Sequence, residues 1–455
     1  MEAKELVRDL VARSRAAQQI FANATQQQAD AAVRAICKAV ADHAAPLAKE
    51  AAEETGMGVY EHKIQKNYGK ATLIWNDLKD KPSVGVLRYI PERNIMEIAK
   101  PVGVVCCIAP CTNPTVTPLS NTAFALKCRN SIIIAPHPRS KKCTKTVVEL
   151  FRAELQKLGL PADLVLMIEE PTLELSSELM ASVDVVVATG GMGMVKAAYS
   201  SGKPAFGVGA GNDQCIVDTD VCLEEVAEKV VQGRTFDNGM PCTSEQCVIV
   251  QRGQMQEMLQ KLEEKGAYVL QDEAQAQMLR STLFPDNGPI NRHVVGQPIA
   301  KIAELAGVKI PDGTKLIAIQ AAGCGKEDVL CREKMCPVLA VLPYDTFEQA
   351  VDIAFQNLMV EGKGHCTVLH SNTPEHIEYV GTTLPISRLV VNQCGASSGG
   401  GAWENGLTPT TTLGCGSWGN NSISDNFTYK YLMNVTRVAY RKENVKPASY
   451  EEIFG

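Results

Sequence analysis

The sequence predicts an α/β protein in which helices surround parallel β-sheets, and three observations support this prediction. The chain has 455 residues, which is enough for two or three domains at about 100–200 residues each. From residue 102 onward, short apolar runs alternate with stretches of helical period, which is the pattern of βαβ units. One of these runs leads directly into a glycine-rich turn at 190–193, as strands do before helices in doubly wound sheets.

The first eighty residues are predicted to be helical. Thr25 and Gln28 have the spacing of a capping box, which marks the beginning of a helix. Val33, Ile36 and Val40 then recur at helical period, so one face of this helix is expected to be buried.

A β-hairpin is predicted at 83–100. Apolar residues alternate on both sides of the turn formers at 91–94, as expected for two paired strands. A hairpin that projects from the body is a plausible contact between subunits.

Four strands of a first parallel sheet are predicted, with a helix at 144–158 between the second and the third. Their continuous apolar character indicates burial on both faces. The predicted strands are 104–109, 132–135, 164–168 and 183–188.

A second α/β unit is predicted from residue 247 to about 391. A strand at 215–217 and a helix near 224–233 precede it. A loop rich in Ser, Gly and Thr follows at 393–421.

Composition excludes several classes of protein. Lys and Arg number 45 against 51 Asp and Glu, a net charge of −6, so a basic nucleic-acid-binding surface is not expected. No apolar run reaches the roughly 18 residues of a membrane span, and the N-terminus lacks an apolar signal core. The 16 cysteines lie in ordinary hydrophobic runs and without paired zinc spacing, which favours a reducing cytoplasm and no metal site.

Two segments are candidates for binding a nucleotide. The turn at 190–193 and the glycines at 207–211 do not have the G-x-G-x-x-G spacing, so this pattern leaves nucleotide binding and simple tight turns equally open. The segment PHPRSKK at 136–142 follows a predicted strand and opens a helix. Its cations suit a ribose or a 2′-phosphate at the carboxyl edge of the sheet, or they form a solvated helix start.

Cys242 is a candidate nucleophile because it lies in a loop of turn formers before a polar stretch. A thiol in such a loop can be partly exposed, and its thiolate is the reactive form. Cys415, in another glycine-rich loop, is an equal candidate, and the residue pattern does not separate the two.

Seven ordered strings resemble the CoA-acylating aldehyde dehydrogenases over nearly the whole chain, most of all the CoA-dependent succinate-semialdehyde dehydrogenases. They are TNPT (112–115), PHPRSKK (136–142), ATGGMGMVKAAYSSGKPAFGVGAGN (188–212), FDNGMPCTSEQ (236–246), EKMCPVL (333–339), GHC (364–366) and LGCGSWGNNSIS (413–424). The resemblance implies a reaction in which an aldehyde, CoA and NAD(P)⁺ interconvert with an acyl-CoA and NAD(P)H.

The resemblance assigns the catalytic roles to three residues. Cys242 matches the nucleophile, whose thiolate would form a hemithioacetal and then a thioester. Asn113, with the Cys242 N–H, would donate to the developing oxyanion, and His365 matches the active-site histidine of the acylating branch.

Cofactor-binding residues are carried over in the same way. Glu333 matches the glutamate that holds the nicotinamide ribose, and His137, Arg139 and Lys141 fall at the adenosine end. The other matching positions are Pro110, Cys111, Thr112, Pro114, Thr115, Gly190, Gly191, Gly209 and Leu413. The lysines after Arg139 favour NADP over NAD.

Hydrolytic aldehyde dehydrogenases carry a glutamate, in an ELGGK string, that activates water. The corresponding stretch at 206–212 has no carboxylate, which favours CoA as the acyl acceptor.

Succinate semialdehyde is the favoured substrate, with Arg388, Ser397 and Ser398 as candidates for binding its anionic end. Sulfoacetaldehyde, giving sulfoacetyl-CoA, is the alternative, and acetaldehyde is third.

The resemblance also implies the aldehyde dehydrogenase fold, with a cofactor domain at 1–224 that includes an oligomerisation hairpin at 83–101. A catalytic domain with the nucleophile would span 225–415, and 416–455 would return to the cofactor domain and end in an oligomerisation strand. A homodimer or homotetramer is expected. A scaffold subunit without activity is the alternative of a different class, and the filled catalytic positions disfavour it.

Overall fold

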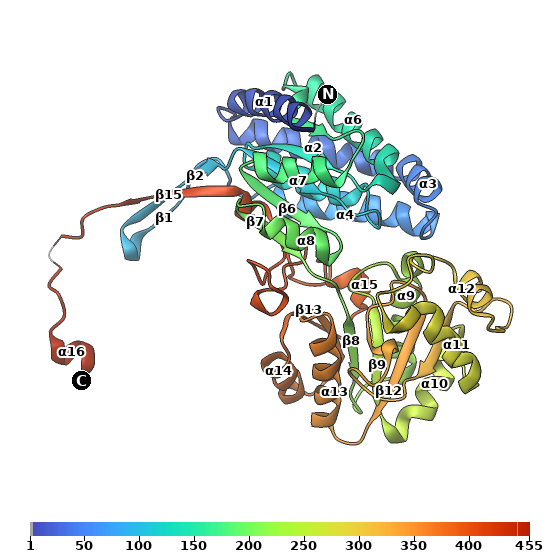
Figure 1. Cartoon of the computed structure of the whole chain (residues 1–455). Helices are drawn as coiled ribbons and strands as arrows, with labels where there is room; N and C mark the ends of the chain where they lie inside the picture. Colours follow the sequence, from blue (N-terminus) through green and yellow to red (C-terminus); the bar gives the residue numbers. More distant parts are fainter. Residues whose placement is uncertain (1–2, 444) are drawn as a thin grey trace.

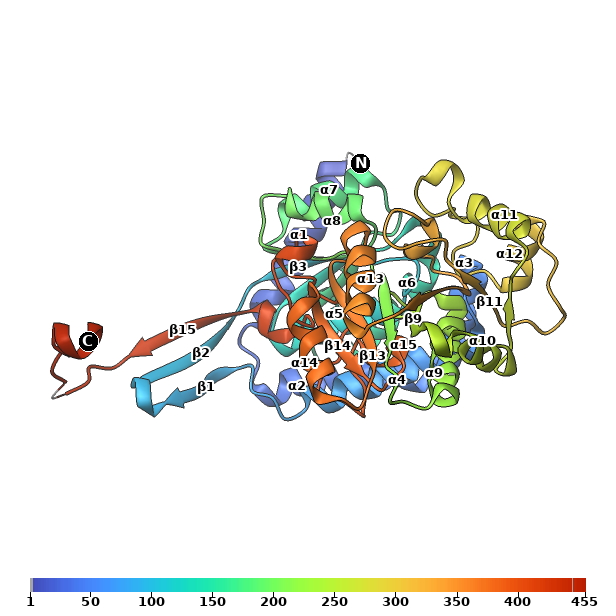
Figure 2. The same ribbon diagram turned by 90° about the horizontal axis from the view of Figure 1, so that it is seen from below.

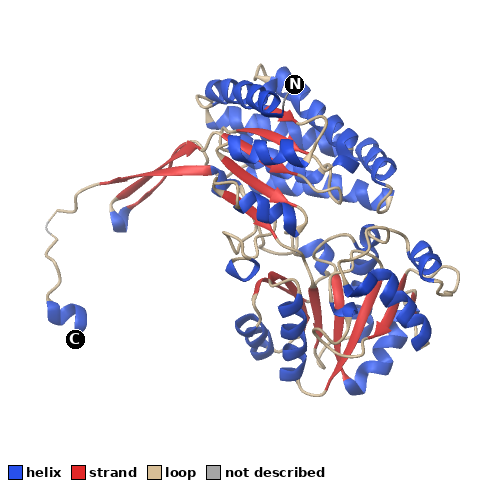
Figure 3. Cartoon of the chain, in the orientation of Figure 1, coloured by secondary structure: helices blue, strands red, loops and turns tan. Residues whose placement is uncertain are grey.

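The computed structural model describes residues 3–443 and 445–455, which form two α/β bodies and a projecting three-stranded sheet (Figure 1). Each body contains a parallel sheet between two layers of helices (Figure 3). The predicted fold class is confirmed.

The first body has a five-stranded sheet of order β5-β4-β3-β6-β7. Its strands are β3 (Val104–Ile108), β4 (Ser131–Ala135), β5 (Val165–Met167), β6 (Val185–Thr189) and β7 (Ala205–Val208). Alternate residues of β3 enter different cores: Val105 and Cys107 pack with α2, α5 and α6, whereas Cys106 packs with α1 and α7. Burial on both faces explains the continuous apolar run.

The helices of the first body lie on both faces of this sheet. The capping box is present at the start of α2, where Thr25 and Gln28 bond reciprocally. The helices are α1 (Ala3–Phe21), α2 (Gln26–Asp42), α3 (Ala44–Thr55), α4 (Tyr60–Leu78), α5 (Val116–Lys127), α6 (Lys141–Lys157), α7 (Leu173–Ser182) and α8 (Met192–Tyr199).

The second body has a seven-stranded parallel sheet of order β10-β11-β12-β9-β8-β13-β14. Its strands are β8 (Asp213–Val217), β9 (Glu245–Gln251), β10 (Ala267–Val269), β11 (Leu316–Gln320), β12 (Val338–Tyr344), β13 (Gly364–His370) and β14 (Ile386–Val391). Its helices are α9 (Leu223–Thr235), α10 (Met255–Glu264), α11 (Glu273–Leu283), α12 (Ile299–Ala306), α13 (Phe347–Val360), α14 (Pro374–Thr383) and α15 (Gly395–Ser398).

The predicted boundary after residue 224 is wrong by about a dozen residues. Strand β8 pairs in parallel with β9 and β13, so it belongs to the second body. The chain passes between the bodies after β7 ends at Val208. A buried strand has the same continuous apolar pattern in either sheet, so the sequence did not show which sheet β8 would join. The prediction also omitted β7, which overlaps the glycine-rich stretch at 207–211.

The projecting sheet consists of the predicted hairpin and the predicted C-terminal strand (Figures 1 and 2). Strands β1 (Gly85–Ile90) and β2 (Ile95–Pro101) are antiparallel, and β15 (Met433–Ala439) pairs antiparallel with β2. Beyond it, α16 (Tyr450–Phe454) lies away from both bodies (Figure 1). Within the described residues, no helix has the length and apolarity needed to cross a membrane.

Candidate active site

The Cys242 loop connects α9 to the amino end of β9. A short 3₁₀ segment, Phe236–Gly239, begins it, and Asp237, Asn238 and Gly239 have φ of 51°, 55° and 69°. These left-handed residues reverse the chain direction. Cys242 is then half-buried at the start of the polar stretch that precedes β9.

Cys242 lines a cavity of about 390 Å³ between the two bodies. The first body contributes residues of α4 together with Asn113 and Val116, and the second body contributes the Cys242 loop and the loop that begins at Cys394. Leu413 and Ser397 also line it. Four predicted site residues from distant parts of the sequence therefore meet at one cavity.

The rival candidate nucleophile does not share this position. Cys415 is fully buried, and its Sγ lies 3.4 Å from the carbonyl oxygen of Leu413. It is not among the residues lining the cavity. The structure therefore favours Cys242 over Cys415.

The thiol form of Cys242 is favoured in this state. Burial, together with the nearby Glu333 and Asp213, raises its pKa to about 12, and Arg388 opposes this rise. Because the thiolate is the nucleophile, a proton must leave Sγ before attack.

Asn113 is available to a ligand. Its side-chain Oδ1 is buried and has no hydrogen-bond partner within the described part of the chain, while its backbone oxygen accepts the Thr117 N–H at 3.2 Å. Only the amide Nδ2 can donate to an oxyanion, and Asn113 lines the same cavity as Cys242, which is consistent with the predicted oxyanion role.

Two lysines of α4 that were not predicted as site residues line the same cavity. Lys66 donates to Asp237 Oδ2 at 2.8 Å, and Lys70 donates to the Gly400 carbonyl oxygen at 2.8 Å. Their spacing of four residues places them on one helix face, which is the signal that could have identified them. Burial lowers the pKa of Lys70 to about 8.

His365 lies behind the cavity rather than in its lining. It is fully buried on β13, and its Nδ1 lies 3.2 Å from Asp213 Oδ1. Its Nε2 is buried without a partner within the described residues. This geometry fixes the orientation of the ring and leaves one nitrogen free.

Glu333 is also buried near Cys242. Burial, together with the neighbouring Glu361, raises its pKa to about 8, and the Gly211 N–H opposes this rise. The backbone N–H of Glu333 donates to Glu361 Oε2 at 3.0 Å. A carboxyl group in this state suits the predicted hydrogen bonding to a ribose hydroxyl.

The expectation that Arg388 binds the anionic end of the substrate is not supported by its position. Its guanidinium is buried and donates to the carbonyl oxygens of His365 at 3.0 Å and Gly414 at 2.9 Å, and to Asn426 Oδ1 at 3.1 Å. These oxygens occupy the two terminal nitrogens of the guanidinium, whereas Nε has no partner within the described residues. Arg388 is also absent from the cavity lining, so its position indicates a structural role. Ser397 lines the cavity, whereas Ser398 is buried outside the lining.

The glycines predicted to face the dinucleotide have open sides. A Cβ added to Gly191 would contact nothing within 4 Å, and at Gly209 the nearest atom would be 3.8 Å away. Gly190 is similarly open, with its nearest atom at 4.0 Å. These positions leave room for a flat group against the backbone.

The β3–α5 loop carries five predicted cofactor residues, which do not share one environment. Pro110, Cys111 and Thr112 are half-buried. Pro114 is buried and accepts a hydrogen bond from Thr144, and Thr115 donates to Asn67 Oδ1 at 2.7 Å. Thr115 therefore contacts α4 rather than an open surface.

The segment predicted to bind the adenosine end of the cofactor has less unpaired positive charge than the sequence suggested. His137 Nδ1 accepts the Arg139 N–H at 3.1 Å, and the Arg139 side chain donates to the Thr55 carbonyl oxygen at 3.1 Å. Lys141 pairs with Glu170. Glu54 accepts the backbone N–H groups of Lys142 and Cys143, each at 2.8 Å, so a carboxylate already occupies the start of α6.

Comparisons with known proteins agree with this arrangement. The model of the aldehyde dehydrogenase family matches residues 1–279. Succinate-semialdehyde dehydrogenase (acetylating) of Clostridium kluyveri is 51% identical over 449 residues, covering 99% of each chain. Sulfoacetaldehyde dehydrogenase of an Acholeplasma species is 39% identical, covering 99% of this chain and 94% of its own.

Among solved structures, an acetylating aldehyde dehydrogenase from Geobacillus thermoglucosidasius superposes with a TM-score of 0.94. It is 37% identical, and the match covers 98% of this chain and 99% of the other. The fold is therefore that of this group of proteins.

Proposed function

Because the chain belongs to the aldehyde dehydrogenase family, we propose that it is a CoA-acylating member that interconverts an anionic aldehyde with its acyl-CoA. The observation that carries this proposal is the approach of Gly211 to Cys242. A Cβ at Gly211 would lie 2.1 Å from the carbonyl oxygen of Cys242. A side chain at residue 211 would therefore displace Cys242, and the stretch 206–212, which corresponds to the one that carries the water-activating glutamate in hydrolytic relatives, has no carboxylate. Without that general base, a second thiol can take the acyl group.

Different residues of the chain are proposed to act at different steps of the reaction. The Cys242 thiolate attacks the aldehyde carbon, and Asn113 with the Cys242 N–H stabilises the oxyanion. Collapse of the hemithioacetal leaves a thioester on Cys242. When bound, NAD(P)⁺ accepts the hydride. The CoA thiol, on losing its proton, then attacks the acyl carbon, so that acyl-CoA forms and the Cys242 thiolate leaves.

His365 is proposed to exchange protons with the reacting thiols. Asp213 orients its ring, and its Nε2 is free. Because His365 does not line the cavity, this role requires a water or a small movement to relay the proton. Glu333 is proposed to hold the nicotinamide ribose, and the open sides of Gly191 and Gly209 support stacking of the cofactor there.

We propose succinate semialdehyde as the substrate. Lys66 and Lys70 both line the cavity that holds Cys242. Lys66 is already paired with Asp237, so a carboxylate at the far end of the substrate would pair with Lys70. The one carboxylate in the described lining, Glu404, is exposed. Sulfoacetaldehyde presents a similar anion and is the second candidate, because a protein of that name is also a close relative. Acetaldehyde would leave Lys70 without an anionic partner.

We propose NAD rather than NADP as the cofactor, in contrast to the sequence-based expectation. The 2′-phosphate of NADP would meet the Glu54 carboxylate at the start of α6, and like charges repel. The pairing of Lys141 with Glu170 further reduces the positive charge available to a phosphate.

We further propose a homodimer or homotetramer joined through the projecting sheet, in the cytoplasm. Strands β1 and β15 are the two edges of that sheet, and unpaired edges bind other strands. The 16 thiols, none of which forms a disulfide within the described chain, suit a reducing compartment. Size-exclusion chromatography coupled to light scattering tests the oligomer.

The function is tested by following reduction of the nicotinamide with succinate semialdehyde or sulfoacetaldehyde, with and without CoA. We expect turnover that requires CoA and is faster with succinate semialdehyde. Acid release in the absence of CoA would contradict the acylating mechanism, and equal rates with acetaldehyde would contradict the anionic substrate class.

A further inference from the structure

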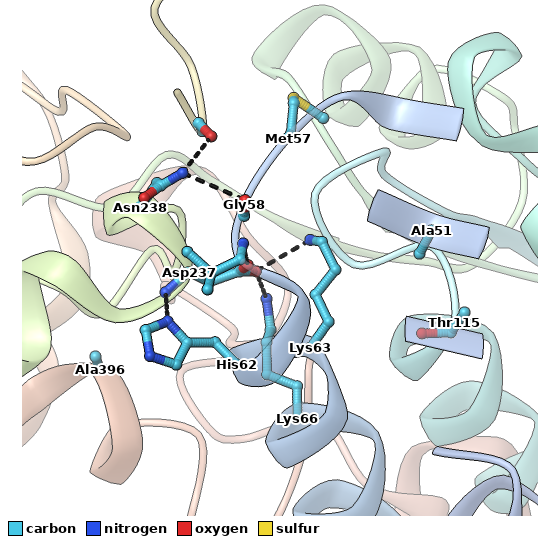
Figure 4. Close-up of polar contacts among 12 residues, drawn as sticks. Ala51, Met57, Gly58, His62, Lys63, Lys66, Thr115, Asp237, Asn238 and Ala396 are labelled. Atoms are coloured by element: carbon cyan, nitrogen blue, oxygen red, sulfur yellow. Dashed lines mark hydrogen bonds and ion pairs between the residues drawn. The ribbon is translucent and has the colours of Figure 1, made fainter. Parts of the chain in front are cut away.

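The Cys242 loop is tied to α4 of the other body through one buried carboxylate, that of Asp237 (Figure 4). Its Oδ1 accepts the Val59 N–H at 2.8 Å, and its Oδ2 accepts Nζ of Lys63 at 3.2 Å and of Lys66 at 2.8 Å. The side chain has no exposed surface. Three donors from the start of α4 therefore converge on one side chain of the loop.

The backbone of the loop is held at the same place. The Asp237 N–H donates to His62 Nδ1 at 2.8 Å, and the Asn238 side chain donates to the carbonyl oxygens of Gly58 at 3.3 Å and Gly296 at 2.9 Å. Asp237 and Asn238 both have positive φ. Residues other than glycine persist in this region only when their surroundings hold them there.

The approach of the two segments is close. Gly58 has a φ of +79°, and a Cβ at this position would lie 2.1 Å from Asp237 Oδ1. A side chain at residue 58 would therefore displace the carboxylate from its donors.

Glycine at residue 237 would adopt the same backbone conformation without strain, so the turn alone does not require an aspartate. The carboxylate adds anchoring to α4, and α4 also carries Lys66 and Lys70 on the cavity wall. We propose that Asp237 is a positioning residue for Cys242, because it holds the left-handed turn against α4 and so keeps Cys242 on the cavity that Asn113 also lines. The proposal rests on the proposed function in taking Cys242 as the nucleophile.

The test compares two variants of Asp237 with a matched control. Asp237→Gly keeps the left-handed backbone and removes the anchor, and Asp237→Asn retains an oxygen for the Val59 N–H but loses the charge. Asp286→Gly is the control, because Asp286 is an exposed left-handed aspartate with φ of 53° outside the site.

Two quantities are measured on the full-length protein. One is kcat and KM for CoA-dependent turnover, and the other is the rate at which iodoacetamide alkylates Cys242 across pH, read from its peptide by mass spectrometry. Asp237→Gly is expected to lower kcat by about 10²-fold, since small misplacements of reacting groups have this effect. KM for CoA should change little, and the pH dependence of Cys242 alkylation should differ from that of the wild type. Asp237→Asn should recover part of the loss in kcat, and Asp286→Gly should match the wild type.

Wild-type kcat and alkylation in Asp237→Gly would overturn the proposal. If Asp237→Gly fails to fold, Asp237→Asn decides by the same measurements. Unfolding of both variants would assign Asp237 to general stability and overturn the positioning role. If the wild type shows no CoA-dependent turnover, the proposed function fails, yet the alkylation comparison still decides whether Asp237 positions Cys242.

Discussion

Gly211 lies so close to Cys242 that a Cβ on the glycine would be 2.1 Å from the cysteine carbonyl oxygen. The segment between β7 and β8, which connects the two bodies, therefore lies directly beside Cys242 and carries no side chain at residue 211. No acidic side chain can stand at this position to activate water. Residues 206–212 therefore bring no carboxylate next to Cys242, which is consistent with a thiol rather than water as the acyl acceptor.

Replacing the nucleophile should abolish turnover without affecting the fold. Cys242→Ala is expected to lose CoA-dependent activity by more than about 10³-fold, with an unchanged melting temperature because Cys242 is only half-buried. Cys415→Ala is the control for the rival thiol and should remain active. Activity retained in Cys242→Ala but lost in Cys415→Ala would reverse the assignment.

Removing one cavity cation should weaken binding of anionic aldehydes selectively. Lys70→Met is expected to raise KM for succinate semialdehyde by about tenfold or more, the usual effect of losing a hydrogen bond to a charged group. KM for propionaldehyde should not rise. Lys79→Met, an exposed lysine at the end of the same helix, is the matched control. A similar rise for both aldehydes would instead indicate a damaged cavity.

The affinity for anionic aldehydes should depend on pH through Lys70. Burial lowers its pKa to about 8, and a lysine is charged below its pKa, so the cation is present at neutral pH and is lost as the pH rises through this value. KM for succinate semialdehyde should therefore rise between about pH 7 and pH 9. The rise should be absent in Lys70→Met. A flat profile in the wild type would argue against a role for this lysine in binding.

Arg388 should affect stability rather than substrate choice. Arg388→Met leaves three carbonyl oxygens without their buried donor, so the free energy of unfolding should fall by about 3 kcal/mol. The ratio of KM values for charged and neutral aldehydes should stay constant. Arg252→Met removes an exposed pair with Asp345, and it should cost less than about 1 kcal/mol. A change in that KM ratio without loss of stability would restore Arg388 as a substrate ligand.

Glu54 should set the preference for the dinucleotide. Glu54→Gln keeps an acceptor for the start of α6 but removes the charge, so the kcat/KM ratio of NADP to NAD should rise by about threefold, as for a charge at a helix terminus. The neighbouring exposed Glu53→Gln should leave this ratio unchanged. If wild-type protein already prefers NADP, the proposed repulsion is absent.

Part of the site could be predicted because it depends on local strings. The loop with Cys242 and the TNPT segment with Asn113 have recognisable residues in a fixed order, and the structure brings both to one cavity. Lys66 and Lys70 were missed because charged residues on a helix usually face solvent. Only the packing of α4 against the Cys242 loop turns that face toward the cavity.

The sequence by itself determined the element types, since apolar period and capping residues act over a few neighbouring positions: the capping box at Thr25, the hairpin and the buried strands all formed as predicted. Only the tertiary structure decided which sheet β8 joins. It also decided that Arg388 binds carbonyl oxygens and that Lys70 faces a cavity. Those outcomes depend on groups distant in the chain, because desolvation and hydrogen bonding are set by what packs against a side chain and not by its neighbours in sequence.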